Sequence, residues 1–290
     1  MMEISSARNT LKIPQIAFDG GSLDTIWDNH ELSIDWFEKH MGLFPTVRAN
    51  KEHFRFDSNS QKEMMTFYPD MFNLHSIITS KRLVHLYAER GVDPNVRWCF
   101  KTKDLKKEHT YLKQNNFRLS DIYDGPGNRR YFDFWATAEG TRLTAVEAPE
   151  LTDNSPRYIS GFIRIGVSNL EASLNWYKKF LGFEYATQDQ GKNRDWAEMT
   201  TLCVENINGQ RVTPITKSYT IYLEKLPEEN SNGHVDGPAR PYFLIEDRKQ
   251  FEQYHRTLRE NGVIVSPITE GFGTFHFYDL DGNRLNVWHY

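Results

Sequence analysis

The hydrophobic pattern of the chain changes between a helical period and a strand period along its length. Segments 33–42 and 173–182 carry apolar residues at positions i, i+3, i+4 and i+7 or i+8, the spacing typical of an amphipathic helix. Both segments end in glycine, at Gly42 and Gly182, and glycine commonly closes a helix in the left-handed conformation. The run 162–167 before the second helix alternates like a strand. A strand followed by a short helix is therefore predicted there.

The two helical segments belong to a longer internal repeat. Residues 96–104 correspond to 239–247, at an offset of 143 against 140 for the helices. In both copies a strand leads into a helix, predicted over 104–116 and 247–261, with an aspartate, Asp104 or Asp247, placed to cap it. A hairpin closes each copy, at 131–144 and 275–286. Matches in the same order at a nearly constant offset indicate a duplication.

The repeat predicts two tandem domains, 10–150 and 158–290. The polar, proline-containing stretch 147–160 reads as the linker between them. A polar excursion, 205–239, interrupts the second repeat, and we expect it to be a surface loop, with a lid as its possible role.

Composition and charge narrow the function. The net charge of −4 and pI of about 6.2 provide no basic field for a nucleic acid, and no apolar run is long enough to cross a bilayer. No secretory signal is recognisable at the N-terminus. The isolated Cys99 and Cys203 lie among apolar residues, which predicts buried thiols and a cytoplasmic location. An aromatic content of 14% favours large cores or pockets lined by flat rings.

Two motifs of the second repeat resemble those of a known superfamily. The opening from Val167 through Tyr177 to Phe183, and the closing Asp279–Leu285, are similar to the start and the last hairpin of vicinal oxygen chelate domains. That superfamily includes glyoxalase I, extradiol dioxygenases, fosfomycin resistance enzymes and bleomycin-binding proteins. The resemblance implies an α+β fold in which paired βαβββ modules form a curved, mostly antiparallel sheet around a cavity. It does not choose among those activities, because one fold hosts several chemistries.

The enzymes of that superfamily hold a divalent metal with three ligands on the sheet. Transferred by motif register, these positions fall on Phe162, Arg240 and Asn286 in the second repeat and on Ser22, Arg97 and Thr144 in the first. None of the six is a His, Asp, Glu or Cys, and a protonated arginine has no lone pair to donate. Only a shift of two residues in the first repeat reaches an acid, Asp24. We therefore expect no metal site and no other cofactor.

Strand alternation predicts what replaces the metal in the second repeat. A pocket is expected that combines aromatic rings, two arginines and polar groups, with His276 facing it across the hairpin. The side chains predicted to line it are Phe162, Arg164, Arg240, Tyr242, Asn286, Trp288 and Tyr290.

Two interpretations of the inward arginines remain open. In the first, each arginine pairs with a local carboxylate such as Glu198 or Asp279 and braces the sheet. In the second, both arginines bind an anionic ligand. In the first repeat Arg97 occupies the position of Arg240 and is likewise predicted to bind the ligand; the alternative is that Asp24 pairs with it and fills the former site. The equivalent positions there are Asp24, Ile26, Arg97, Cys99, Phe134 and Thr144.

The function favoured by these features is metal-independent binding of a small aromatic or anionic molecule in the second-domain cavity. The alternatives are a metal-dependent dioxygenase or lyase with an atypical metal site, an acid–base enzyme with His276 as catalytic residue, and a scaffold kept for oligomer contacts. The expected partners are a small-molecule ligand and, as a possibility, a second copy of the chain. Neither a nucleic acid nor a membrane is expected.

Overall fold

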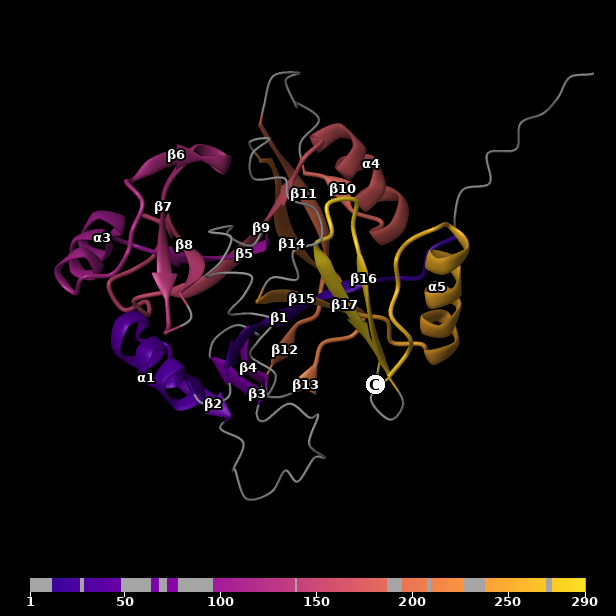
Figure 1. The fold of residues 1–290 in the computed structure, drawn as a ribbon, viewed down its shortest axis with the longest axis horizontal. Coiled ribbons are helices and arrows are strands. Elements are labelled where there is room, and N and C mark those ends of the chain that lie inside the picture. The colour runs from indigo at the N-terminus through magenta and orange to yellow at the C-terminus, as the bar shows by residue number, and fades with distance from the viewer. Residues whose placement is uncertain are drawn as a thin grey trace, which may run out of the picture.

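The structure is a computed structural model, and it describes residues 12–26, 29–47, 64–67, 72–77, 96–138, 140–186, 195–207, 210–226, 238–269 and 273–289. Within these ranges the chain forms four successive modules (Figure 1). Each module starts with a strand, continues through a helix and returns to the sheet with further strands. Each of the two repeats therefore contains two modules of its own, so the strand–helix–strand unit occurs four times in the described residues.

The first repeat supplies modules 1 and 2. Module 1 contains β1 (Ala17–Ile26), α1 (His30–Met41), β2 (Pro45–Val47), β3 (Met64–Phe67) and β4 (Phe72–Ile77). Module 2 contains β5 (Val96–Thr102), α3 (Leu105–Gln114), β6 (Tyr123–Gly125), the 3-10 turn η2 (Pro126–Asn128), β7 (Arg129–Ala136) and β8 (Thr141–Glu147).

The second repeat supplies modules 3 and 4. Module 3 contains β9 (Ile159–Val167), α4 (Leu170–Leu181), β10 (Glu184–Tyr185), β11 (Trp196–Cys203), β12 (Asn206–Ile207), β13 (Gln210–Arg211) and β14 (Lys217–Lys225). Module 4 contains β15 (Ala239–Leu244), α5 (Arg248–Glu260), β16 (Thr274–Tyr278) and β17 (Arg284–Trp288).

The predicted helix ends are confirmed. The Asp104 carboxylate accepts a hydrogen bond from the Lys107 backbone N–H at 3.0 Å, and Asp247 accepts one from the Gln250 N–H at 2.8 Å. Gly42 and Gly182 end α1 and α4 with φ of 67° and 68°. Most other residues are disfavoured in that left-handed conformation by their Cβ, so the cap signals in the sequence were sufficient to place these helices.

The prediction of a surface loop over 205–239 is wrong for its middle part. β14 lies there, paired on one side with β11 and on the other with β9. Its sequence KSYTIYLEK alternates, with Ile221 and Leu223 fully buried and Lys217 and Lys225 exposed at the ends. The charged ends and the neighbouring polar residues favoured a loop in the prediction. The interior of the segment nevertheless has the period of two expected for a strand.

The first strands of the modules pair across the two repeats. β5 of module 2 runs antiparallel to β9 of module 3, and β1 of module 1 runs antiparallel to β15 of module 4. Within each module the first strand pairs in parallel with the last one, β1 with β4, β5 with β8, β9 with β14 and β15 with β17. The α+β class with a large, mostly antiparallel sheet is confirmed, and its pairing crosses the predicted domains instead of staying within them.

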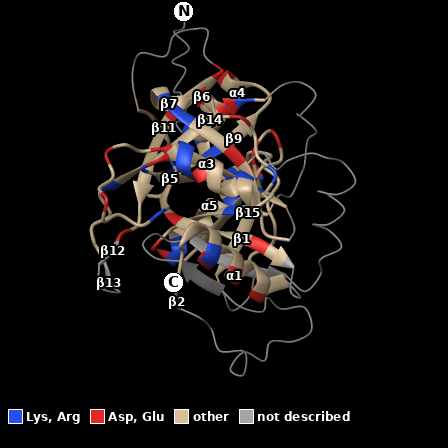
Figure 2. Ribbon diagram, turned by 90° about the vertical axis from the view of Figure 1, so that its left-hand side faces the viewer, with Lys and Arg blue, Asp and Glu red and all other residues tan. Residues whose placement is uncertain are grey.

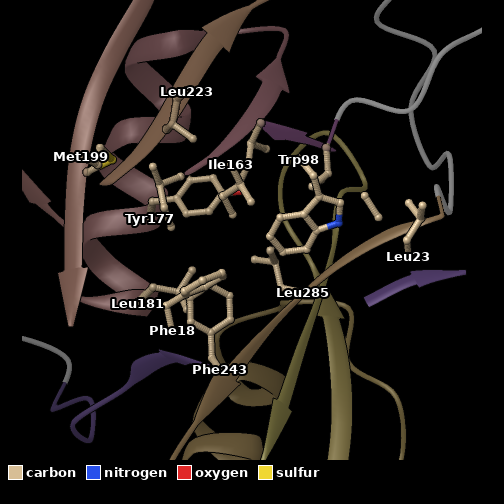
Figure 3. Packing of buried hydrophobic residues seen from close by; sticks show 14 of the residues in the cluster. Phe18, Leu23, Trp98, Ile163, Tyr177, Leu181, Met199, Leu223, Phe243 and Leu285 are labelled. Carbon is tan, nitrogen blue, oxygen red and sulfur yellow. The ribbon is translucent and has the colours of Figure 1, made fainter. Parts of the chain in front are cut away.

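Apolar side chains of the helices and of the strands that they pack on form the main hydrophobic core. In Figure 1, α1 and α3 lie on one side of the strands and α4 and α5 on the other. Figure 3 shows the Trp98 ring of β5 beside Leu23 of β1 and Leu285 of β17, so side chains from three modules meet there. A Cβ on Gly21 of β1 would lie 2.3 Å from the Trp98 ring and 2.5 Å from the Arg240 carbonyl oxygen. None of the helices that the structure describes is long and apolar enough to cross a membrane.

The close approach at Gly21 generates a test of the cross-repeat pairing. Gly21→Ala is expected to lower the free energy of unfolding by about 1–3 kcal/mol, because the methyl group overpacks a junction of β1, β5 and β15. Gly140→Ala is the control, since a Cβ there meets nothing within 4 Å and only the positive φ of 67° opposes it. Urea unfolding monitored by tryptophan fluorescence measures both. Equal losses in the two variants would contradict the packing described for Gly21.

Candidate functional site

Polar and charged side chains gather on the face of the sheet opposite the helices. On each strand the residues that pack toward the helices are apolar, as Trp98 and Phe100 do on β5 and Ile163 and Ile165 do on β9. The alternate positions point to the other face. Two groups of interacting side chains lie on it, one on modules 2 and 3 and one on modules 1 and 4.

The first group, the Arg97 cluster, is a network of buried ion pairs. Its members are Arg97, Tyr123, Asp133, Arg142, Thr144, Arg164 and Glu224. Arg97 and Arg164 lie opposite each other in the β5–β9 register. The Glu224 carboxylate of β14 bridges them, pairing with Arg97 through one oxygen and with Arg164 Nη2 through the other at 2.6 Å.

A second carboxylate completes the network. Asp133 accepts hydrogen bonds from Arg142 Nη2 and from the Thr144 hydroxyl, both at 2.6 Å, and Arg97 Nη1 lies 3.6 Å away. The Tyr123 hydroxyl donates to Asp133 at 3.1 Å and accepts from Arg164 Nη1 at 2.8 Å. Opposite charges therefore alternate through the cluster.

Burial and charge oppose each other in these carboxyl groups. Burial raises the pKa of Asp133, but the guanidiniums of Arg97 and Arg142 outweigh it and hold the pKa below its ordinary value. For Glu224 the balance is the same, with Arg97 and Arg164 as the opposing charges, and its pKa is also lowered. Both groups are therefore ionised at neutral pH and serve as counter-ions, because a buried guanidinium is costly without one.

Aromatic side chains fill the remaining space on this face of modules 2 and 3. Tyr131, Phe162 and Tyr222 form a separate buried cluster with Cys99 and Val146, and the Phe162 and Tyr222 rings meet edge to face at 4.8 Å. The η2 turn covers them, since the Tyr131 hydroxyl donates to the Pro126 carbonyl at 2.6 Å. The chain's own side chains thus occupy this half.

The second group, the Arg240 cluster, is partly open to solvent. Its members are Asp24, Arg240, Tyr242, His276, Arg284, Asn286 and Trp288. Arg240 forms an ion pair with Asp24, and both are buried. Arg284 Nε donates to Asn286 Oδ1 at 3.2 Å, and the Tyr242 and Trp288 rings meet edge to face at 5.8 Å.

Side chains at the outer side of the Arg240 cluster are only half-buried, namely Tyr242, His276, Arg284 and Trp288. His276 lies opposite Asn286 in the β16–β17 register, and its ring contacts Tyr278. Burial raises the pKa of Tyr242, so this phenol stays protonated and can donate a hydrogen bond. Aromatic faces, cations and amide groups thus converge at a surface that solvent reaches.

The structure divides the predicted pocket between the two clusters. Arg164 belongs to the Arg97 cluster and Phe162 to the aromatic group beside it. The other cluster contains Arg240, Tyr242, Asn286, Trp288 and His276; Tyr290 is outside the described residues. Both arginines have carboxylate partners, but these are Glu224 and Asp24 and not Glu198 or Asp279. The expected pair of Asp24 with Arg97 does not form, because β1 pairs with β15 and not with β5. The expectation for Phe134 is also wrong, since it packs toward the helices, and Cys203 is half-buried, unlike Cys99.

Sequence reasoning missed four charged members of the clusters. Asp133 and Arg142 alternate with apolar residues on the first hairpin. On the last hairpin, Arg284 occupies the position that matches Arg142. Glu224 lies in the segment predicted to be a loop. The signal was a charge at an interior position of an alternating strand, since such a charge requires a partner on the neighbouring strand.

Within the described part of the chain, no three His, Cys, Asp or Glu side chains lie close enough to hold a metal ion. In the β1–β4 ladder, Asp24 lies opposite His75.

Figure 2 shows basic and acidic segments interspersed on the side that carries β5, β9 and β14, in keeping with internal pairing of the charges.

The Arg97 cluster generates a stability test. Asp133→Asn is expected to lower the free energy of unfolding by about 3 kcal/mol or more, because it leaves buried guanidiniums without one of their counter-ions. Asp153→Asn removes the exposed pair of Asp153 with Lys103 and should have no measurable effect. Urea titrations of the three proteins at pH 7 provide the comparison. A loss at Asp133 no larger than at Asp153 would be incompatible with the buried network.

The lowered pKa of Glu224 predicts a pH dependence. Because the folded protein binds this proton less readily than the unfolded chain, the stabilisation is present above the ordinary carboxyl range, near pH 4.3, and disappears as the pH falls. The gap in urea midpoint between wild type and Glu224→Gln should therefore shrink below about pH 4. Asp279 is the control of opposite sign. Burial raises its pKa to about 6, so the wild type loses stability as the pH rises through that value. The urea midpoint of Asp279→Asn should therefore rise relative to that of the wild type over the same range.

Comparison with known proteins agrees with this architecture. Residues 159–287 match the Glyoxalase/Bleomycin resistance protein/Dioxygenase superfamily. Glyoxalase I from Zea mays superposes over 95% of this chain and 92% of its own with a TM-score of 0.58 at 11% identity. A putative dioxygenase from Bacillus subtilis superposes over 96% of this chain and 86% of its own, with a TM-score of 0.59 at 10% identity. Curated protein sequences give no match. The second half of the chain therefore belongs to the glyoxalase/bleomycin resistance/dioxygenase superfamily, and the whole chain has the fold of glyoxalase I.

Proposed function

We propose that the protein binds a small aromatic or anionic molecule at the Arg240 cluster, without a metal ion. The observation that carries this proposal is the pairing of two half-buried rings, Tyr242 and Trp288, with the cationic and amide groups of Arg240, Arg284 and Asn286 on the same face. Small-molecule sites typically combine apolar and aromatic walls with a few polar groups that fix orientation.

The contrast between the two clusters favours this half of the sheet. In the Arg97 cluster the side chains of Arg164 and Arg97 are 1% and 5% exposed, and the Tyr131 ring lies 5.2 Å from the Arg164 guanidinium. In the Arg240 cluster the side chains at the equivalent outer positions are half-buried. A ligand would have to displace packed side chains at the first cluster, whereas the half-buried side chains of the second are accessible from the surface.

Apolar residues border the Arg240 cluster. Ala17, Val204, Ile215 and Leu244 form a small buried group on the same face, and the Trp288 ring packs against it. A flat ring that lies on Trp288 would extend over this apolar border, and such contacts between rings contribute beyond the area they bury. The aromatic part of the ligand is assigned to this side and its polar part to Arg284 and Asn286.

His276 is the remaining candidate for chemistry at this site. It is half-buried and lies next to Asn286 on the neighbouring strand, within the reach of a ligand held by the cluster. A histidine so placed donates a hydrogen bond to the ligand or acts as a general acid or base. Binding by itself does not require the second role.

Melting temperature measured against a panel of aromatic acids, phenols and amides tests the proposal. Ligands that bind the folded state raise the melting temperature. Trp288→Leu is expected to remove the shift, whereas Trp135→Leu should keep it, because that ring lies on β7 and stacks on Arg118 at 3.9 Å. A shift that survives Trp288→Leu would place the site elsewhere. Stoichiometric Fe, Mn, Ni or Zn in the purified protein would contradict metal-independent binding and favour a lyase or dioxygenase.

A further inference from the structure

The turn between β16 and β17 docks on the corner where β9 leads into α4. The Tyr177 hydroxyl of α4 donates a hydrogen bond to Asp279 Oδ2 at 2.8 Å, and both groups are buried. Asn283 Nδ2, from the other end of the same turn, donates to the Gly166 carbonyl of β9 at 3.0 Å. Side chains thus tie the last hairpin of module 4 to module 3.

Asp279 is the centre of this contact, and its hydrogen-bond donors are neutral. Besides the Tyr177 phenol, its carboxylate accepts from Asn283 Nδ2 at 2.8 Å and from the backbone N–H groups of Asp281 and Asn283 at 2.9 and 2.8 Å. Three other buried carboxylates each pair with an arginine, namely Asp24, Glu108 and Asp133. Within the described residues, the charge of Asp279 is therefore met by hydrogen bonds and not by a cation.

The matching contact of the first repeat has no such polar pair. Phe37 corresponds to Tyr177 at the repeat offset of 140, and Ala136 corresponds to Asp279 in the register of the two hairpins. Both are fully buried apolar residues. The fold therefore does not require a carboxylate and a phenol at this position, and the second repeat alone has them.

Burial opposes the ionisation of Asp279. The four hydrogen bonds favour the charged form, but burial outweighs them and raises the pKa of Asp279 to about 6. The titratable groups that face it are the Tyr177 phenol from α4 and the Asp281 carboxylate from its own turn, while the β9 corner contributes backbone groups to the turn. Burial raises the pKa of Tyr177 well above its ordinary value, so the phenol remains a donor. His276, the histidine of the same hairpin, lies on the helix-free face.

We propose that the turn around Asp279 is a proton-sensitive latch, which holds the last hairpin on α4 and releases it more readily as the pH rises. A carboxyl group that leaves this contact for solvent returns to its ordinary pKa, so its ionisation favours the released state. The Tyr177 hydroxyl limits the release, because its hydrogen bond to the ionised carboxylate is charge-assisted. The latch does not depend on the proposed ligand. The helix-free face of the hairpin carries His276, Arg284 and Asn286, so release moves that side of the Arg240 cluster.

Hydrogen exchange of backbone amides measures the release. After correction for the intrinsic exchange rate, opening of the β16–β17 ladder should increase by up to about 10-fold between pH 5 and pH 8, since the Asp279 carboxyl titrates at about 6 in the latch and near its ordinary value of 3.8 in solvent. The β7–β8 ladder of the first repeat is the internal control and should show a smaller change. Asp279→Asn retains His276 and should abolish the trend.

Two tyrosine variants isolate the hydrogen bond. Tyr177→Phe removes the donor to Asp279, whereas Tyr254→Phe removes an equally buried hydroxyl that donates at 2.8 Å to the Phe180 carbonyl of α4. The loss in urea midpoint caused by Tyr177→Phe should be roughly twice as large at pH 8 as at pH 5, because the bond is charge-assisted only when the carboxyl is ionised. Tyr254→Phe should cause the same loss at both pH values, since a carbonyl acceptor does not titrate.

Three results would contradict the latch. Opening that is independent of pH, or that rises equally in the β16–β17 and β7–β8 ladders, would show that the hairpin is not released by itself. A pH trend that persists in Asp279→Asn would belong to another group, with His276 as the first candidate. Equal losses of Tyr177→Phe at pH 5 and pH 8 would exclude a charge-assisted bond. No ligand enters these measurements, so they leave the proposed function to its own test.

Discussion

Two guanidinium groups face each other where the two repeats meet, and the rest of the sheet is arranged around that constraint. Arg97 and Arg164 are opposite each other in the β5–β9 register, so like charges would meet in a buried position unless a carboxylate came between them. Glu224 does so from β14, which ties the last strand of module 3 to both first strands. Asp133 and Tyr123 extend the same pairing to β7 and β6.

This ion-pair network explains why one half of the duplicated sheet is filled. The Glu224 and Asp133 carboxylates pair with the arginines there, and Tyr131, Phe162 and Tyr222 form a buried aromatic group on the same face. In the other half, His276 occupies the position on β16 that Asp133 occupies on β7.

The two halves also differ in rigidity and exposure. Arg164 and Asp133 are almost completely buried, which fixes the geometry of module 2 against module 3. Tyr242, Arg284 and Trp288 are half-buried. Two copies of one module thus differ in how far their helix-free faces are buried.

The sequence by itself determined the local elements, the duplication and the absence of ligand residues at the expected metal positions. Caps at Asp104, Asp247, Gly42 and Gly182 act within one turn of the chain, so local residues are sufficient to specify them. β14 was missed because polar ends hid its alternation.

Only the tertiary structure decided which residues share a site. Strand alternation tells which face a side chain takes, but not which strand lies beside it, because pairing between modules depends on contacts far apart in the chain. Both Arg164 and Arg240 point to the helix-free face as expected. The cross-repeat pairing of β5 with β9 and of β1 with β15 then separated them and gave each its own carboxylate, Glu224 and Asp24.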